Sequence, residues 1–140
     1  MKKIDELTYD LNGAAIEVHR ALGPGLLESA YEAAFCYELT SRKIPFVRQK
    51  DVPVVYKGIK IDCGYRIDVL ADDRVIVELK AVEKLLPVHE AQLLTYLKLS
   101  HLSLGLLINF NVPVLKDGIR RLVNNLEDSS ALSASSAVKE

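Results

Sequence analysis

The chain has 140 residues, of which 49% are hydrophobic and 26% are charged. This length suits one domain with a substantial core, and this balance excludes a disordered chain. The formal net charge is −1, from 18 basic and 19 acidic residues. A uniformly basic nucleic-acid coat protein is therefore excluded, and any site for a polyanion must be a local patch.

Membrane, export and zinc signals are missing from the sequence. No apolar run approaches the roughly 18 residues that a membrane span needs, and the start, MKKIDE, lacks the apolar segment of a signal peptide. Cys36 and Cys63 match no CxxC metal spacing. Two isolated thiols without an export signal indicate reduced cysteines, so we expect a cytoplasmic protein with no membrane partner and no structural zinc.

Two helices are predicted at the N-terminal end. Residues 5–22 carry apolar side chains at helical spacing, and Gly23-Pro24-Gly25 then interrupts the chain. A second helix is expected from about residue 26 to residue 42. Its expected inner face consists of Leu27, Ala30, Tyr31, Ala34 and Tyr37.

Residues 44–82 are rich in β-branched side chains and predict two hairpins. The first joins residues 52–56 and 59–62 across Lys57-Gly58, and the second joins residues 65–70 and 75–82 across a tight turn at residues 71–74.

The C-terminal part contains one predicted helix, at residues 88–99, and one buried strand, at residues 104–110. Residues 118–126 fit either a short helix or a strand. The resulting order, ααβββαβ with an ambiguous last element, predicts an α/β fold in which helices cover a mixed sheet. We expect a single domain over residues 1–127 and a flexible tail, rich in Ser and Ala, over residues 128–140.

The second hairpin carries the most informative charges. Side chains alternate along a strand, so Glu78 and Lys80 point the same way, and the turn at residues 71–74 brings Asp68 to the level of Glu78. Their neighbours are apolar, so these charges need partners or a metal ion. Two carboxylates suit Mg²⁺, and a nearby lysine can assist a metal-bound water. The plainer alternative is a solvated strand face with an ordinary Glu–Lys pair.

The pattern D-x9-E-x-K on consecutive strands resembles the PD-(D/E)xK nuclease superfamily. The RecB-like branch of that superfamily adds a G-x-x-D start and a Q-x-x-x-Y helix. Here Gly64 precedes Asp68 by one residue more than in that start, and Gln92 and Tyr96 share a helix face. Ile67 stands where the superfamily name has proline.

A second resemblance lies in the N-terminal half. The segment GLLESAY at residues 25–31 reads G-x-x-E-x-x-Y, the signature of a family of small bacterial proteins grouped with these nucleases. The resemblance covers roughly residues 5–123. It implies a restriction-endonuclease-like core, in which a mixed sheet is flanked by helices.

The resemblance also implies a metal site. Asp68 and Glu78 would bind Mg²⁺ or Mn²⁺, with the Leu79 carbonyl as a candidate third oxygen. Glu28 would correspond to the helical glutamate of the superfamily and would complete the metal shell. A carboxylate at the start of a helix is also favoured by the helix dipole alone, which is the structural alternative for Glu28.

Catalytic and substrate-binding roles follow from the same resemblance. Lys80 would position or activate the attacking water, and Gln92 would orient Lys80 or a substrate phosphate together with Tyr96. His89 is a further candidate substrate contact, and its alternative is a surface or capping role. Tyr31 and Tyr96 are also candidates, although aromatic residues at helical spacing are more often part of a core.

Residues 42–66 form a basic strip. They hold seven Lys and Arg residues, including Arg66, and two Asp residues, a local net charge of +5. Such a strip could follow a phosphate backbone. Alternatively, these side chains only solvate the edges of the first hairpin.

Two main functional hypotheses result. The first is a metal-dependent nuclease that hydrolyses phosphodiester bonds of DNA, or of RNA, by metal-activated water. The second is a non-catalytic nucleic-acid-binding or assembly module that retains the nuclease fold. A homodimer is compatible with either, because residues 102–110 and the helix at residues 88–99 offer apolar surface.

Overall fold

The structure is a computed structural model that describes residues 2–125. The predicted tail at residues 128–140 lies outside the described residues. The elements are α1 (Ile4–Leu22), α2 (Glu28–Ser41), β1 (Phe46–Asp51), β2 (Val54–Tyr56), β3 (Ile59–Ile61), β4 (Arg66–Ala71), β5 (Val75–Lys80), α3 (Pro87–Ser100), β6 (Leu104–Asn109), the 3₁₀ helix η1 (Leu115–Gly118) and β7 (Ile119–Val123). None of the helices in this part of the chain is long and apolar enough to cross a membrane.

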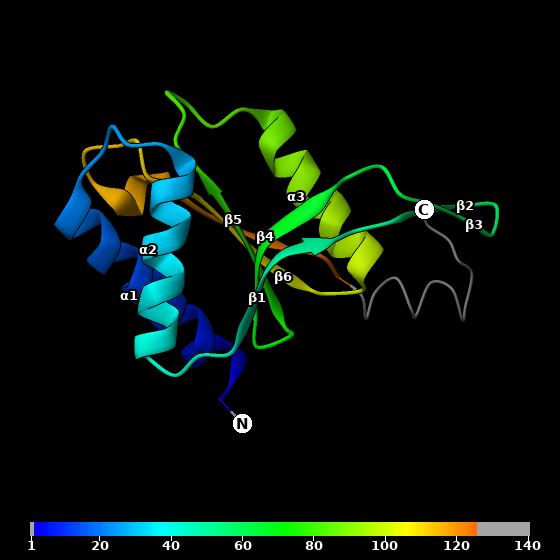
Figure 1. Cartoon of the computed structure of the whole chain (residues 1–140), viewed down its shortest axis with the longest axis horizontal. Helices are drawn as coiled ribbons and strands as arrows, with labels where there is room; N and C mark the ends of the chain where they lie inside the picture. The colour runs from blue at the N-terminus through cyan, green and yellow to red at the C-terminus, as the bar shows by residue number, and fades with distance from the viewer. Residues whose placement is uncertain (1, 126–140) are drawn as a thin grey trace.

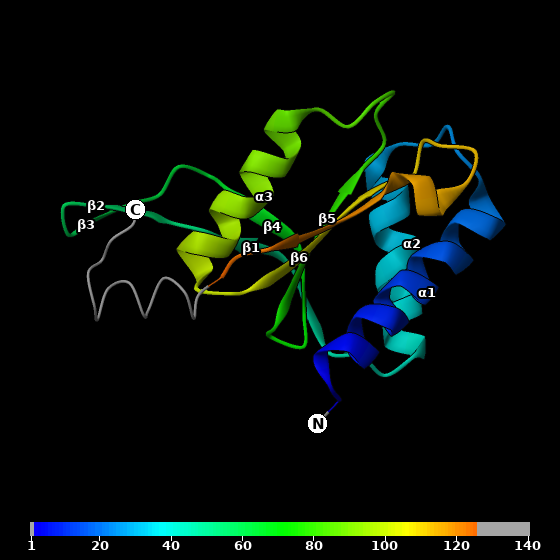
Figure 2. The same cartoon turned by 180° about the vertical axis from the view of Figure 1, so that it is seen from behind.

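A mixed five-stranded sheet forms the middle layer, in the order β1-β4-β5-β6-β7. β5 and β6 are parallel, and the other three neighbouring pairs are antiparallel. A parallel pair needs a crossover connection, which α3 provides between β5 and β6. Figures 1 and 2 show α1 and α2 on one side of the sheet and α3 on the other. The predicted α/β fold, with a mixed sheet flanked by helices, is confirmed.

Each face of the sheet has its own hydrophobic core, because side chains of β5 and β6 alternate between the two faces. Val75, Val77 and Leu79 of β5 pack in the core under α1 and α2. Ile76 packs in the core under α3, together with Leu93. The charged residues discussed below therefore lie next to well-packed apolar layers.

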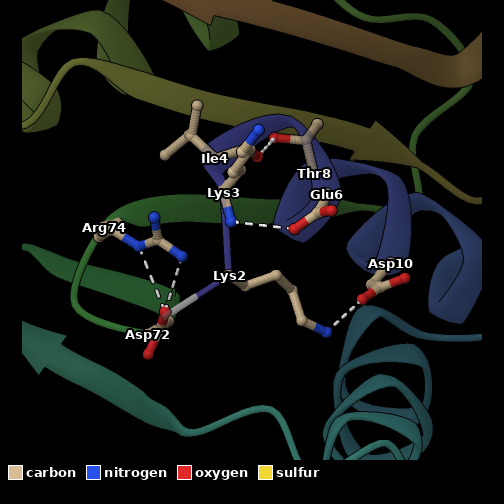
Figure 3. Close-up of polar contacts among 8 residues, drawn as sticks. All are labelled: Lys2, Lys3, Ile4, Glu6, Thr8, Asp10, Asp72 and Arg74. Carbon is tan, nitrogen blue, oxygen red and sulfur yellow. Dashed lines mark hydrogen bonds and ion pairs between the residues drawn. The ribbon is translucent and has the colours of Figure 1, made fainter.

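The turn between β4 and β5 lies beside the start of α1. Figure 3 shows Lys2 paired with Asp10, and Arg74 paired with Asp72 of this turn. Lys2 and Asp72 also line one shared pocket. The turn end of the β4–β5 hairpin and the start of the N-terminal helix therefore border the same pocket.

The predicted inner face of α2 was wrong in part. Tyr31 is buried as expected, but Leu27 and Tyr37 are 77% and 71% exposed. The buried stripe instead runs through Phe35 and Leu39, four and eight residues after Tyr31. Apolar residues occur all round this helix, so spacing alone did not fix which side faces the sheet.

The predicted strand order ααβββαβ was also incomplete. Five strands lie between α2 and α3, the four of the two predicted hairpins and β1 (Phe46–Asp51) before them. β1 had no hairpin signal of its own, yet it pairs with β4 at the edge of the main sheet. β2 and β3 form a separate two-stranded sheet, joined at Lys57 and Gly58, whose φ angles of 51° and 80° are typical of a type I′ turn.

The C-terminal elements decide the ambiguous last segment and the location of the apolar stretch before it. Residues 119–123 form a strand, so the ambiguous segment at residues 118–126 is not a helix where it is described. β6 lies between β5 and β7, and all six of its residues are buried. The apolar stretch from Leu104 to Asn109 therefore fills the core and is not available as the surface of a homodimer.

Candidate active site at the diverging ends of two strands

The site is built by the β4–β5 hairpin. Backbone pairing in this hairpin covers Ala71 with Val75, Leu70 with Ile76, and Val69 with Val77, and does not extend further. Figures 1 and 2 show the two strands separating from this point onward. The next residues on the two strands are Asp68 and Glu78, which confirms the predicted register of the hairpin.

Two carboxylates replace the missing backbone acceptors where the strands separate. The Asp68 backbone N–H donates to Glu78 Oε2 at 2.9 Å, and the Leu79 backbone N–H donates to Asp68 Oδ2, also at 2.9 Å. These crossed hydrogen bonds hold one oxygen of each carboxylate and leave the other oxygen, Asp68 Oδ1 or Glu78 Oε1, for other partners. The hairpin thus positions both acidic side chains without help from a flexible loop.

Burial makes the charged forms of both carboxylates unfavourable. Glu78 is 4% exposed, and its pKa is raised to about 8, first by burial and then by the neighbouring Asp68 carboxylate. Burial likewise raises the pKa of Asp68, against the hydrogen bond from the Leu79 amide. A cation or a proton bound between the two carboxylates would relieve this cost.

Lys80 is the positive charge of the site. It lies two residues after Glu78 on β5 and is half-buried. Its ammonium group lowers the pKa of both Asp68 and Glu78, against the effect of burial. The structure therefore brings together three of the predicted catalytic residues.

Glu32 on α2 is an acidic residue beside the carboxylate pair that the sequence analysis missed. Gln49, opposite Asp68 on β1, donates from Nε2 to Glu32 Oε1 at 2.9 Å and to Asp68 Oδ1 at 3.4 Å. Arg48 also donates to Glu32, at 3.2 Å. The Glu32 charge raises the pKa of both Asp68 and Glu78. Glu32 is thus linked to the carboxylate pair through one amide side chain.

Glu28, the predicted helical glutamate, is not brought to the pair. It is the first residue of α2 and is exposed, one helical turn before Glu32. Residues four apart share a helix face, so the sequence offered both glutamates on the same side. Only the packing of α2 decides which of them lies near Asp68.

The structure brings together two candidate metal ligands, whereas the sequence analysis expected three. Within residues 2–125, no group of three His, Cys, Asp or Glu side chains is arranged to hold a metal ion. The trio of Asp68, Glu78 and Glu28 is therefore not assembled. What the structure assembles is the Asp68–Glu78 pair.

Gln92 and Tyr96 lie on α3, on the far side of the pair from α2. The pKa of Tyr96 is raised, first by burial and then by the charges of Glu78 and Asp68. Gln92 lines a surface pocket with Tyr96. In the described part of the chain, its amide makes no hydrogen bond to Lys80.

Tyr31 lies in the core instead of at the surface. Its ring is fully buried and stacks on Phe110, with ring centroids 4.5 Å apart. Its hydroxyl donates to the Gly23 carbonyl at 2.5 Å and accepts the Leu26 N–H at 3.1 Å. These contacts fix the loop before α2 and give Tyr31 a structural role, not contact with a substrate.

His89 and Arg66 are also occupied by local contacts. His89 Nδ1 accepts the Leu86 N–H at 3.0 Å and so caps the start of α3, the capping role that the sequence left open. Arg66 is exposed at the first position of β4 and pairs with Asp51 at 3.1 Å. Of these two, Arg66 lies closer along the chain to the carboxylate pair, two residues before Asp68.

The basic strip at residues 42–66 is broken up by ion pairs. Three of its arginines have acidic partners in the structure: Arg42 with Glu38, Arg48 with Glu32, and Arg66 with Asp51. Lys57 and Lys60 lie on the exposed β2–β3 hairpin. The strip is therefore not one continuous track of free positive charge.

Comparison with known proteins gives one result. The sequence model of the PD-(D/E)XK nuclease superfamily matches residues 5–122, which include both helices before the sheet and the whole carboxylate site. No curated protein and no solved structure matches the chain significantly.

Proposed function

Because this chain belongs to the PD-(D/E)XK nuclease superfamily, we propose that it hydrolyses phosphodiester bonds of nucleic acid, DNA in the first place, with Mg²⁺ or Mn²⁺ held by Asp68 and Glu78. The family supports a nuclease-type function. The observation that carries the specific proposal is the pair of crossed hydrogen bonds, which holds the buried Glu78 carboxylate and the half-buried Asp68 carboxylate between diverging strands.

The donor set of two carboxylates fits Mg²⁺ or Mn²⁺ better than zinc or copper. Mg²⁺ prefers oxygen and is commonly held by one or two carboxylates, with waters and substrate phosphates as its other ligands. Asp68 and Glu78 each keep one carboxylate oxygen that the crossed hydrogen bonds do not use. With only two carboxylates, we expect weak binding of the metal alone and tighter binding once a phosphate is present. A bound divalent cation would supply Lewis-acid polarisation and a more acidic water.

The other residues of the site have separable roles. Lys80 lies close enough to the pair to hold or orient an attacking water and to offset negative charge that develops on the phosphate. Glu32 and Gln49 restrain Asp68 from the α2 side. Outer contacts of this kind tune metal ligands without binding the metal themselves.

We also propose that the chain belongs to the GxxExxY group within the superfamily, with RecB-like features in Gln92 and Tyr96. The structure gives the motif a local explanation. Gly25 has a φ of 102°, a conformation that favours glycine, and the Tyr31 hydroxyl closes the loop that leads into α2. Glu28, at the first position of α2, is favoured there by the helix dipole.

A cleavage assay tests the proposal. Labelled single- and double-stranded DNA and RNA are incubated with the wild type, with Asp68→Asn, and with Asp73→Asn as a matched control at the exposed turn of the same hairpin. Asn is tolerated at Asp73, whose φ is 56°. We expect cleavage that needs Mg²⁺, is abolished by EDTA, falls at least about 1,000-fold in Asp68→Asn, and is unchanged in Asp73→Asn.

Two results would contradict this proposal. Cleavage that persists in Asp68→Asn would move the chemistry elsewhere. Nucleic-acid binding without any cleavage, indifferent to metal and to Asp68, would instead support the non-catalytic binding module.

A further inference from the structure

A small pocket lies between α3 on one side and Val54 and Tyr65 on the other. Its volume is about 260 Å³, and its wall includes Val54, Tyr65, Val88, Gln92, Thr95 and Tyr96. This volume is just below the roughly 300–1,000 Å³ of pockets that hold a whole small-molecule ligand. The pocket therefore suits one flat ring system that belongs to a larger molecule.

Aromatic rings and apolar side chains dominate this pocket. Tyr65 is 44% exposed, and its ring lies against the almost fully buried ring of Tyr96, with centroids 6.2 Å apart. Tyr96 is held in the core under α3, so it backs Tyr65 from the protein side. The planes of the two rings are tilted by 59°, so Tyr96 supports Tyr65 from one side, and part of the Tyr65 surface is open for stacking with a ligand.

Two polar side chains at the pocket have unused hydrogen-bonding groups. Thr8 and Thr40 both donate to the carbonyl four residues earlier in their helices. By contrast, the Thr95 hydroxyl donates no hydrogen bond to a backbone carbonyl in the part of the chain that the structure describes. Within the same residues, the Gln92 amide makes no hydrogen bond to any protein group. An apolar pocket with a few free polar groups is the usual form of a specific ligand site.

The pocket is placed to act together with the carboxylate pair. Tyr65 is the residue just before β4 and precedes Asp68 by three residues, a separation of at most about 10 Å along an extended chain. Tyr96 lines the pocket, and after burial the charges of Glu78 and Asp68 raise its pKa, so it links the pocket to the carboxylate pair electrostatically. A strand whose phosphate reached the carboxylates would bring an adjacent base to Tyr65.

We propose that this pocket binds one unpaired nucleobase by stacking it on Tyr65, so that the substrate of the site is single-stranded nucleic acid or an unpaired segment. This inference rests on the proposed function. A base in a duplex has both faces covered by its neighbours, whereas an unpaired base has a face free for an aromatic side chain. The Gln92 amide and the Thr95 hydroxyl offer a donor and acceptors to the edge of the base.

Fluorescence anisotropy with labelled oligonucleotides tests the inference. Wild type, Tyr65→Ala and Tyr65→Phe are titrated into oligo-dT, oligo-U and a DNA duplex, with EDTA and again with Mg²⁺ on ice. Tyr37→Ala is the matched control, since Tyr37 is an exposed tyrosine on α2 that does not line the pocket. Circular dichroism verifies that every variant is folded.

We expect single strands to bind more tightly than the duplex. Tyr65→Ala should lose about 5- to 150-fold in affinity, the equivalent of one base stack on an aromatic residue, while Tyr65→Phe and Tyr37→Ala bind like the wild type. One abasic nucleotide, moved along the oligonucleotide, should weaken binding at one position for the wild type and at none for Tyr65→Ala. The ratio of the dT and U affinities then separates DNA from RNA.

A failure of this inference can be distinguished from a failure of the proposed function. A folded Tyr65→Ala variant that binds single strands as the wild type does would overturn this inference alone, as would tighter binding of the duplex. If the wild type binds no nucleic acid under either condition, both this inference and the proposed function are wrong.

Discussion

The two halves of the β4–β5 hairpin differ in what satisfies the backbone between the strands. Near the turn, Leu70 and Ile76 form an ordinary backbone-paired ladder, and the side chains on both faces are apolar and buried. Beyond Val69 and Val77, the backbone pairing stops and the carboxylates of Asp68 and Glu78 accept the amides. We call these parts the closed half (residues 69–77) and the open half (Asp68 and residues 78–80).

This contrast shows how one hairpin serves two purposes. The closed half contributes hydrophobic burial and fixes the register. The open half uses that register to hold two carboxylates at a cost in desolvation, which is visible in the raised pKa of Glu78, about 8. Substitutions in the closed half should therefore change stability, and substitutions in the open half should change chemistry, in some cases with a gain in stability.

Lys80→Ala tests the chemistry of the open half while both carboxylates stay in place. Removal of the ammonium group that acts on the pair should lower the rate of cleavage by about 100-fold or more. Mg²⁺ binding should remain, because both carboxylates remain. Single-turnover cleavage together with calorimetry measures the two effects. Lys84→Ala, at an exposed lysine just after β5, should match the wild type in both, and an equal loss in both lysine variants would argue against the role of Lys80.

Ile76→Ala tests the closed half. Ile76 is fully buried in the core under α3, so its truncation should lower the free energy of unfolding by about 3 kcal/mol. The cleavage rate per folded molecule should stay close to that of the wild type. Chemical denaturation gives the stability, with Val123→Ala on exposed β7 as the control. If the cleavage rate fell as strongly as the stability, the two halves would not be separable.

Glu78→Gln should abolish cleavage and yet stabilise the folded protein at alkaline pH. The folded-state pKa of Glu78, about 8, lies above its ordinary value of 4.5. The folded protein therefore binds the extra proton between these pH values, and the stability from this group is fully present below about pH 4.5 and is lost as the pH rises through 8. Glutamine carries no charge at any pH and keeps a side-chain oxygen to accept the Asp68 amide.

In EDTA, we accordingly expect Glu78→Gln to be more stable than the wild type at pH 9, by on the order of 2 kcal/mol, and close to it at pH 5. Cleavage should be lost at both pH values. Thermal unfolding across this pH range measures the difference. A difference that is constant with pH, or that grows toward acidic pH, would contradict the assigned cause.

The smallest expected effect separates the two glutamates of α2. Glu32→Gln removes the charge that is linked to Asp68 through Gln49, and should weaken Mg²⁺-dependent cleavage by about tenfold. Glu28→Gln should change it less than about twofold, because Glu28 is exposed at the start of α2. Rates at several Mg²⁺ concentrations compare the two variants directly, and the reverse order would restore Glu28 as the metal-site residue.

The sequence predicted the parts of the site that depend on local rules. A tight turn and strand alternation were enough to place Asp68 level with Glu78 and to set Lys80 two residues beyond. The overall α/β fold followed in the same way, from hairpins, one crossover helix and a buried strand.

The remaining features depend on packing between distant segments, which local patterns do not encode. The position of α2 along its axis selects Glu32 over Glu28, since both lie on one side of the helix and differ by one turn. β1 becomes an edge strand only because β4 is available to pair with it. Tyr31 looks like a site residue in the sequence, and its burial against Phe110 is decided by the core beneath α2.

The central claim is that the open half of the hairpin binds a divalent cation through Asp68 and Glu78. The most direct measurement is calorimetric titration of Mg²⁺ into the wild type, into the double variant Asp68→Asn/Glu78→Gln, and into Asp73→Asn. The account predicts one weak site in the wild type and in Asp73→Asn, and no detectable binding in the double variant. Equal binding by the double variant, or none by the wild type, would contradict it.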